Sequence, residues 1–456
     1  MQTPSSQKFW QLMELRSMTF GLILLGLGIR IIALIALADL PLGSDPLGYH
    51  TMAIQLSENE KFSPFWPPGL PYYLLIFYSI FGESEFTGRV AMLFFYLVFN
   101  LSLFLLAKEI TTTKIANLVV LVFVLFPTYI FHSVEILTML PAATYLILIT
   151  YLMVLMKKRF LWIYPIALGL VISLLILTRP SSIIFLVLIP IYIFFTTKKI
   201  SAAIVPLFLS MLIIFIWVEK AHQMTGRWIF INDASSVAFF NGNNTYTPLY
   251  KTWWFGSHTS LDVPESYKEL KKEINELPPE IQNSTYRKTA INHIKQNIDL
   301  FFIRTINRAR NFFAFDTFTG GRLIGGYSIN KLTGLTVIFF DALFYCTIML
   351  FAIRFFFARF DRNKPFEYIG LLLLITIGYA APYWIAFSHP TYHFPITPFF
   401  GIIAAKLIVE KLDTTSNNSS PWLWKPMGKK RYVYFFITLL FVLIQIEWII
   451  RMWDRI

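Results

Sequence analysis

One acidic residue stands out in the stretch Gly43-Ser44-Asp45-Pro46-Leu47-Gly48-Tyr49-His50. It follows the first long apolar segment, at the level of the lipid headgroups, and apolar residues then recur at the helical spacing of an interfacial helix. A carboxylate there can take a proton from an acceptor hydroxyl, so Asp45 is the candidate catalytic base. Alternatively Asp45 caps the helix, because Asp is favoured at N-caps. The two roles are compatible, and Tyr49 and His50 are the pocket residues beside it.

Ionisable side chains also occur near the ends of other apolar segments, where they are costly unless they face a cavity or a partner. Arg matches phosphate with two hydrogen bonds, and an imidazole can donate one. The expected phosphate-binding residues are Arg179, His393 and, behind them, Arg89. The other expected pocket residues are His132, Glu135, His389 and Tyr392. The alternatives for the arginines are snorkelling to the interface or pairing with Glu135.

The run Phe65-Trp66-Pro67-Pro68-Gly69-Leu70-Pro71 predicts a rigid turn before a second apolar helix, because three prolines and a glycine restrict the backbone. Its direct role is a turn with headgroup-level aromatic residues. Such a turn could also hold Asp45 in place.

The composition requires a membrane around these residues. Of 456 residues, 56% are hydrophobic and only 14% are charged, whereas soluble domains carry about a quarter charged residues. The net charge of +13 indicates an excess of Lys and Arg in cytoplasmic loops rather than a surface that binds nucleic acid. The lone Cys346 excludes an intrachain disulfide framework, and the histidines show no metal-ligand spacing. We expect no cofactor and no metal among the site residues, with a divalent metal as the alternative.

About eleven apolar segments are long enough to cross a bilayer as helices. They lie at roughly 17–38, 86–107, 113–131, 134–156, 160–178, 180–197, 200–218, 334–357, 366–387, 393–410 and 432–450. Lys and Arg concentrate in alternate short loops, which the positive-inside rule assigns to the cytoplasm. Asp45 and the other polar residues then face outward from the inner (plasma) membrane.

Three regions follow from this pattern. Residues 1–220 form an N-terminal transmembrane region with a first extracytoplasmic loop at 39–85, and residues 333–456 form the C-terminal transmembrane helices. Between them, residues 221–332 form a large extracytoplasmic loop, with helices expected from Glu265 to Leu277 and from Tyr286 to Phe315. The predicted fold is therefore an all-α polytopic bundle with interfacial helices.

The order of these motifs resembles the bacterial members of glycosyltransferase family 39, within the GT-C superfamily. The resemblance rests on Asp45 with Gly48-Tyr49-His50, the Trp66-Pro67-Pro68-Gly69 turn, Arg89, Ser133-Val134-Glu135, Thr178-Arg179-Pro180, Asn241-Gly242-Asn243-Asn244, Ile294–Phe313 and Tyr392-His393-Phe394-Pro395. These marks cover most of the chain. The resemblance implies a GT-C-type bundle and an enzyme, a hexosyl- or pentosyltransferase.

The resemblance further implies transfer of a sugar from a polyprenyl-phosphate donor to a lipid, glycan or protein acceptor, with inversion. It assigns the role of base to Asp45, and the cationic residues would hold the leaving phosphate. Related mannosyltransferases carry an Asp-Glu pair in this loop, whereas Pro46 follows Asp45 here, which argues against a protein O-mannosyltransferase. The alternatives are a transporter or flippase of lipid-linked sugars, and a glycan ligase or polymerase of the same architecture.

Overall fold

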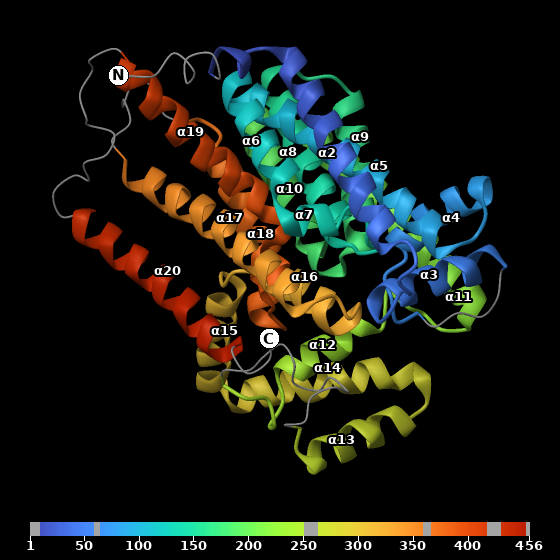
Figure 1. The fold of residues 1–456 in the computed structure, drawn as a ribbon. Coiled ribbons are helices and arrows are strands. Elements are labelled where there is room, and N and C mark those ends of the chain that lie inside the picture. The colour runs from blue at the N-terminus through green and yellow to red at the C-terminus, as the bar shows by residue number, and fades with distance from the viewer. Residues whose placement is uncertain (1–9, 59–63, 250–262, 359–365, 417–429, 453–456) are drawn as a thin grey trace.

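The computed structural model describes residues 10–58, 64–249, 263–358, 366–416 and 430–452. Over these ranges the chain forms helices and turns without a strand, so the predicted all-α fold is confirmed. Most of the helices pack side by side in one bundle (Figure 1). The chain is a multi-pass membrane protein, because many of these helices are both long and apolar.

Among the described residues, 8 helical segments are long and apolar enough to cross a membrane. They are α2 (Arg16–Leu37), α5 (Glu85–Ile110), α8 (Met139–Lys158), η1 (Pro180–Ile184) with α10 (Phe185–Thr197), α11 (Ile200–Thr225), α17 (Lys331–Phe357), η3 (Pro390–Ile396) with α19 (Thr397–Ser416) and α20 (Lys430–Met452).

Shorter apolar helices account for the remaining predicted spans. They are α6 (Thr113–Leu125), α9 (Ile163–Thr178) and α18 (Ile369–Ile385), and a fourth, α4 (Gly69–Phe81), follows the proline-rich turn. Each predicted span therefore corresponds to a helix, but three of these helices are shorter than the sequence pattern indicated.

The helix α6 is short because the backbone breaks at Pro127, where the small helix α7 (Pro127–Phe131) begins. A helical carbonyl accepts from the N–H four residues later. Pro127 has no N–H, and the N–H of Thr128 donates instead to Asp341 Oδ1 at 2.8 Å. The carbonyls of Phe123 and Val124 thus lose their helical donors. Arg30 of α2 replaces both, with Nη1 at 2.9 Å from Val124 O and Nη2 at 3.3 Å from Phe123 O.

The described parts of the segment 221–332, residues 221–249 and 263–332, lie at one end of the bundle together with α3 (Asp45–Ser57), as Figure 1 shows. It forms α12 (Ala234–Gly242), α13 (Glu265–Glu276), α14 (Pro279–Gln296), α15 (Ile298–Phe312), α16 (Phe318–Gly321) and the short turn η2 (Arg322–Gly326). The predicted helix Tyr286–Phe315 is wrong as one helix. It breaks at Asn297, whose φ and ψ of −137° and 58° are not helical.

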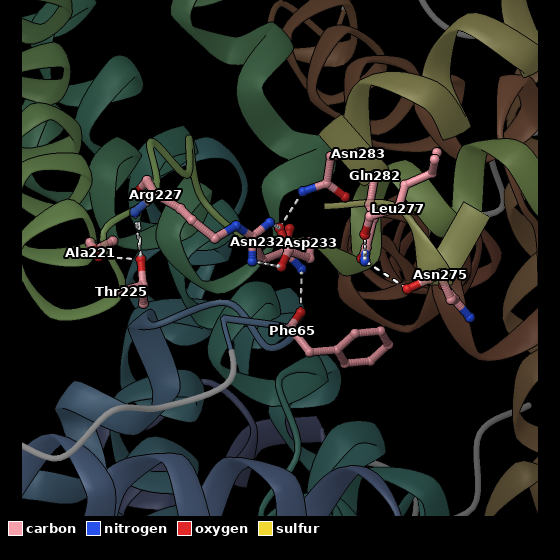
Figure 2. Close-up of polar contacts among 10 residues, drawn as sticks. All are labelled: Phe65, Ala221, Thr225, Arg227, Asn232, Asp233, Asn275, Leu277, Gln282 and Asn283. Carbon is pink, nitrogen blue, oxygen red and sulfur yellow. Dashed lines mark hydrogen bonds and ion pairs between the residues drawn. The ribbon is translucent and has the colours of Figure 1, made fainter. Parts of the chain in front are cut away.

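A polar cluster around Asp233 joins this segment to the first loop (Figure 2). Its carboxylate accepts two bonds from Arg227, at 3.0 and 3.2 Å, and a third from Asn283 of α14. The N–H of Asp233 donates to Pro64 O at 2.9 Å, and Asn232 donates to Phe65 O at 2.9 Å. The start of α12, α14 and the proline-rich turn are therefore held together.

Candidate functional site

Asp45 is the first residue of α3, whose buried face includes Tyr49, Met52, Ala53 and Leu56 as predicted. Ser44 before it has φ 54° and ψ −129°, a conformation that costs a non-glycine residue free energy and is typical of functional sites. The N-cap position belongs to Ser44, and no side-chain cap bond forms there. Asp45 lies in the first helical turn, but its carboxylate does not cap α3.

Two contacts fix the loop that leads to Asp45. The N–H of Leu42 donates to Glu85 at 2.9 Å, and Arg322 donates to the carbonyl of Gly43 at 2.7 Å. The backbone on the N-terminal side of Asp45 is thus tied to the start of α5 and to η2.

Arg179 leaves the helical path at the end of α9 because Pro180 follows it. A residue before proline avoids the helical region, and Arg179 has φ −136° and ψ 91°. One guanidinium nitrogen contacts Met139 Sδ, whereas Nε is buried without a partner. Among the described residues, no carboxylate forms a salt bridge with Arg179. This cation is available to an anionic ligand.

The proline-rich turn packs against both of these sites. The Trp66 indole lies directly on α3, where a Cβ at Gly48 would come within 2.1 Å of Trp66 Nε1. At the other end of the turn, a Cβ at Gly69 would come within 2.4 Å of Thr178 Oγ1. Both glycines are needed for close approach rather than for an unusual backbone angle. The turn connects the helix that carries Asp45 with the residue before Arg179.

Asp45 and Arg179 line the same cavity, which has a volume of about 480 Å³. Tyr49, Trp66 and Tyr392 line it as well. The ring of Tyr392 lies under the Arg179 guanidinium, 5.6 Å from ring centre to the central carbon. Apolar side chains form much of the remaining wall, among them Ile183, Phe230, Ile231, Phe239 and Phe387. The cavity therefore offers a carboxylate, a cation and an apolar surface to one ligand.

The surroundings of Asp45 favour a basic carboxylate. Asp45 is exposed to the cavity, and the protein atoms around its carboxyl replace part of the water and raise its pKa above the ordinary value. The Ser44 hydroxyl at 3.2 Å and the charges of Arg179 and Arg322 act in the opposite direction. A carboxylate with a raised pKa is a better proton acceptor once it is ionised.

Three predicted site residues do not line this cavity. Arg89 donates to the carbonyls of Leu37 and Leu40 at the end of α2 and lies 3.8 Å from Glu135. Arg89 is therefore the cap of α2, not a free cation. Glu135 also accepts from the Tyr327 hydroxyl at 2.6 Å. His50 bonds to the Tyr78 hydroxyl at 2.7 Å, and burial lowers its pKa.

The remaining histidines also lie outside the cavity. The expectation that His393 shares it with Asp45 is wrong, because the ring of His393 stacks on Tyr345 at 4.1 Å and its Nδ1 bonds to Phe312 O. His389 contacts Thr391. The ring of His132 is fully buried without a hydrogen-bond partner. Burial lowers the pKa of His132 and of His389 to about 3, so both are neutral.

Sequence analysis did not identify two arginine side chains near the cavity. Arg287 of α14 lines the cavity from its exposed side, and Arg322 acts on Asp45 from η2. Arg287 lies within the predicted helix from Tyr286, but nothing in that pattern pointed to the site. No group of three or more His, Cys, Asp or Glu side chains that could hold a metal occurs in the described ranges.

Residues 66–219 match the family model described as dolichyl-phosphate-mannose-protein mannosyltransferase. The matched segment is about a third of the chain, and it holds the proline-rich turn and Arg179. It confirms, for this segment, the resemblance to a membrane glycosyltransferase family that the sequence indicated. Asp45 lies before the segment.

Two solved structures are similar over most of the chain. The archaeal oligosaccharyltransferase AglB from Archaeoglobus fulgidus, in complex with an inhibitory peptide and a dolichol-phosphate, has 16% identity and a TM-score of 0.47, covering 97% of this chain and 55% of that one. ArnT from Cupriavidus metallidurans in the apo state has 14% identity and a TM-score of 0.34, and the match covers 87% of this chain and 80% of that one. The chain thus spans about half the length of AglB. No curated protein sequence matches it.

Proposed function

We propose that the chain is an inverting glycosyltransferase that moves a sugar from a polyprenyl-phosphate donor to an envelope acceptor outside the inner membrane. The observation that carries this proposal is the shared cavity of Asp45 and Arg179. These residues come from distant parts of the chain, and the proline-rich turn holds both. The family match over residues 66–219 supports the same activity.

The chemistry assigns a separate task to each side chain. The Asp45 carboxylate accepts the proton of the acceptor hydroxyl while that oxygen attacks the anomeric carbon of the donor. The bond from this carbon to the phosphate oxygen breaks, and the phosphate leaves with the electron pair. Arg179 binds the phosphate, because guanidinium holds such oxygens with two hydrogen bonds. Attack opposite the leaving group inverts the anomeric centre.

The walls of the cavity suit a lipid-linked donor. Apolar side chains from η1, α12 and the end of α18 line the same cavity as Arg179. A prenyl chain can occupy such a surface while its phosphate meets the cation. The acceptor is a lipid, a glycan or a protein hydroxyl.

The direct test uses the purified protein in lipid vesicles with a polyprenyl-phosphate sugar labelled in the sugar. Incubation with a membrane glycolipid extract should give labelled product with wild type and none with Asp45→Asn. Asp39→Asn is the matched control, because Asp39 is an exposed carboxylate of the same loop, and it should retain full activity. Transfer by Asp45→Asn at the wild-type rate would refute the assignment of the base.

The same vesicles separate the alternatives. A transporter or flippase would move the labelled donor across the bilayer without forming product. A ligase or polymerase of whole glycans would require a diphosphate-linked oligosaccharide and leave the monophosphate sugar unchanged. The proposed enzyme should instead release polyprenyl phosphate in equal amount to the product.

A further inference from the structure

A second polar cavity lies beside the proposed site, behind the turn that carries Tyr392. It has a volume of only about 10 Å³, which is room for about one water molecule. Its walls include the carboxyl groups of Asp316 and Asp341, which are 5% and 1% exposed. These residues had no role in the sequence analysis.

The two carboxyl groups differ in their hydrogen bonds. Both oxygens of Asp341 accept from Thr128, from its N–H at 2.8 Å and from its hydroxyl at 2.7 Å. Asp316 Oδ1 accepts from Phe318 N at 2.9 Å and from the Thr391 hydroxyl at 2.8 Å, and the Thr317 N–H also acts on the carboxyl. Asp316 Oδ2 is buried without a partner. Both oxygens of Asp341 are therefore occupied by Thr128, whereas Asp316 Oδ2 has room for a proton.

The residues around this cavity supply no positive charge. Besides the two carboxyl groups, its titratable lining residues are Tyr129 of α7, Tyr345 of α17 and His393 of η3. His393 Nδ1 donates to the Phe312 carbonyl at 2.9 Å, and burial of the ring disfavours its charged form. A negative charge on Asp316 in so small a space would cost free energy that no cationic lining residue offsets.

The neighbouring titratable groups are uncharged as well. His389 contacts the Thr391 hydroxyl at 2.7 Å, and burial keeps its imidazole neutral. His132 lies against Phe318 and Phe394, which flank the cavity residues, and is neutral for the same reason. Neither ring compensates a charge on Asp316.

We propose that Asp316 is a positioning residue that binds a proton in the folded protein and thereby keeps the η3 turn, with Tyr392, in place against Arg179. The link is short, because Thr391 bonds to Asp316 and Tyr392 is the next residue. Ionisation of Asp316 places a charge without a cationic partner in the cavity and draws water into it. The turn then loosens, and Arg179 loses its aromatic support.

The pH dependence has a definite sign. Burial raises the pKa of Asp316 from 3.8 to about 6. A group that binds its proton more tightly when folded stabilises the protein at low pH, and this contribution is lost as the pH rises through the higher value. As the pH rises from 3.8 to about 6, Asp316 therefore lowers the stability of the fold progressively. Above about pH 6 its effect on stability is constant.

The test measures thermal unfolding of the detergent-solubilised protein between about pH 4 and about pH 7. Asn keeps the oxygen that accepts from Thr391 and Phe318 and places an amide where the proton would be. Relative to Asp316→Asn, the wild-type Tm should fall by a few degrees across this range. Asp299→Asn, which changes an exposed carboxyl of α15, should follow the wild-type curve. Asp316→Ala should lower Tm at every pH, because the acceptor is gone.

Parallel curves for the wild type and Asp316→Asn, or a lower Tm of the variant at about pH 7, would overturn the proposal. So would a wild-type Tm that rises with added sodium or calcium chloride while that of Asp316→Asn does not, because the cavity would then hold a cation. This readout does not depend on the proposed function. If transfer is also measured, the donor KM of the wild type, but not of Asp316→Asn, should increase over the same range.

Discussion

Gly69 and Thr178 are in contact although they belong to different helices, and this contact sets the position of Arg179. The proline-rich turn ends at Gly69, and the space of a Cβ there is occupied by Thr178 Oγ1, at 2.4 Å, and by backbone atoms at 2.8 Å. Because backbone cannot rotate away as a flexible side chain does, any side chain at Gly69 must displace the end of α9.

Gly69→Ala should therefore weaken donor binding and lower stability together. Overpacking of this kind costs about 1–3 kcal/mol, and displacement of Arg179 should raise the donor KM. Thermal unfolding and transfer kinetics check both effects. The control is Gly370→Ala on α18, where a Cβ meets nothing within 4 Å. A Gly69→Ala protein with wild-type Tm and KM would show that the turn does not position Arg179.

Arg179→Gln should reduce donor affinity while leaving acceptor affinity nearly unchanged. Loss of a hydrogen bond to a charged group costs about 1.5–3 kcal/mol, which corresponds to a roughly ten- to hundredfold rise in the donor KM. Arg179→Lys should recover part of this, because it keeps the charge but loses the two-pronged geometry. Equal losses for donor and acceptor would instead indicate a structural role.

The rate of transfer should fall on the acid side because Asp45 must be ionised to accept a proton. Withdrawal from water raises its pKa above the ordinary value of 3.8, so the acid limb of kcat/KM should have its midpoint above that value. A pH–rate profile with saturating acceptor provides the measurement. A rate that stays constant down to the ordinary value would exclude Asp45 as the base.

Arg89→Met should destabilise the protein without a specific effect on the donor. Arg89 caps α2 and lies 3.8 Å from the buried Glu135, and breaking a buried pair costs about 3–5 kcal/mol. We expect a lower Tm and lower yield, with an unchanged donor KM in the protein that folds. Arg159→Met, at an exposed arginine, should change neither quantity. If Arg89→Met instead had a raised donor KM and the wild-type Tm, Arg89 would be a phosphate-binding residue.

Sequence analysis located the helices because a bilayer imposes a length and a polarity that apolar runs reveal directly. It singled out Asp45 and Arg179 because each is an ionisable residue at the end of an apolar segment, and both line one cavity. Their catalytic and binding roles stay predictions. It could not decide where adjacent side chains point. Tyr392 and His393 are neighbours in one turn, yet Tyr392 lines the larger cavity and His393 the smaller one.

Arg89 and Glu135 show a second limit of sequence analysis. Charged residues near membrane depth suggest either a ligand site or an internal pair, and only the contacts of Arg89 with the end of α2 distinguish the two. Arg287 and Arg322 show a third limit. Both lie in a segment with many charged residues. Their positions in the sequence therefore do not distinguish them from the other charged residues there.

The break at Pro127 makes α2 more than a membrane anchor. Arg30 supplies the donors for two carbonyls that would otherwise face hydrocarbon unsatisfied. Exchange of α2 for an unrelated apolar segment of equal length should still allow insertion, yet leave α6 with an unsatisfied end. Correct assembly of the bundle thus depends on the side chains of the first helix. A graft that restores Arg30 together with Gly26, where a Cβ would come within 2.0 Å of the Tyr96 hydroxyl, should rescue it.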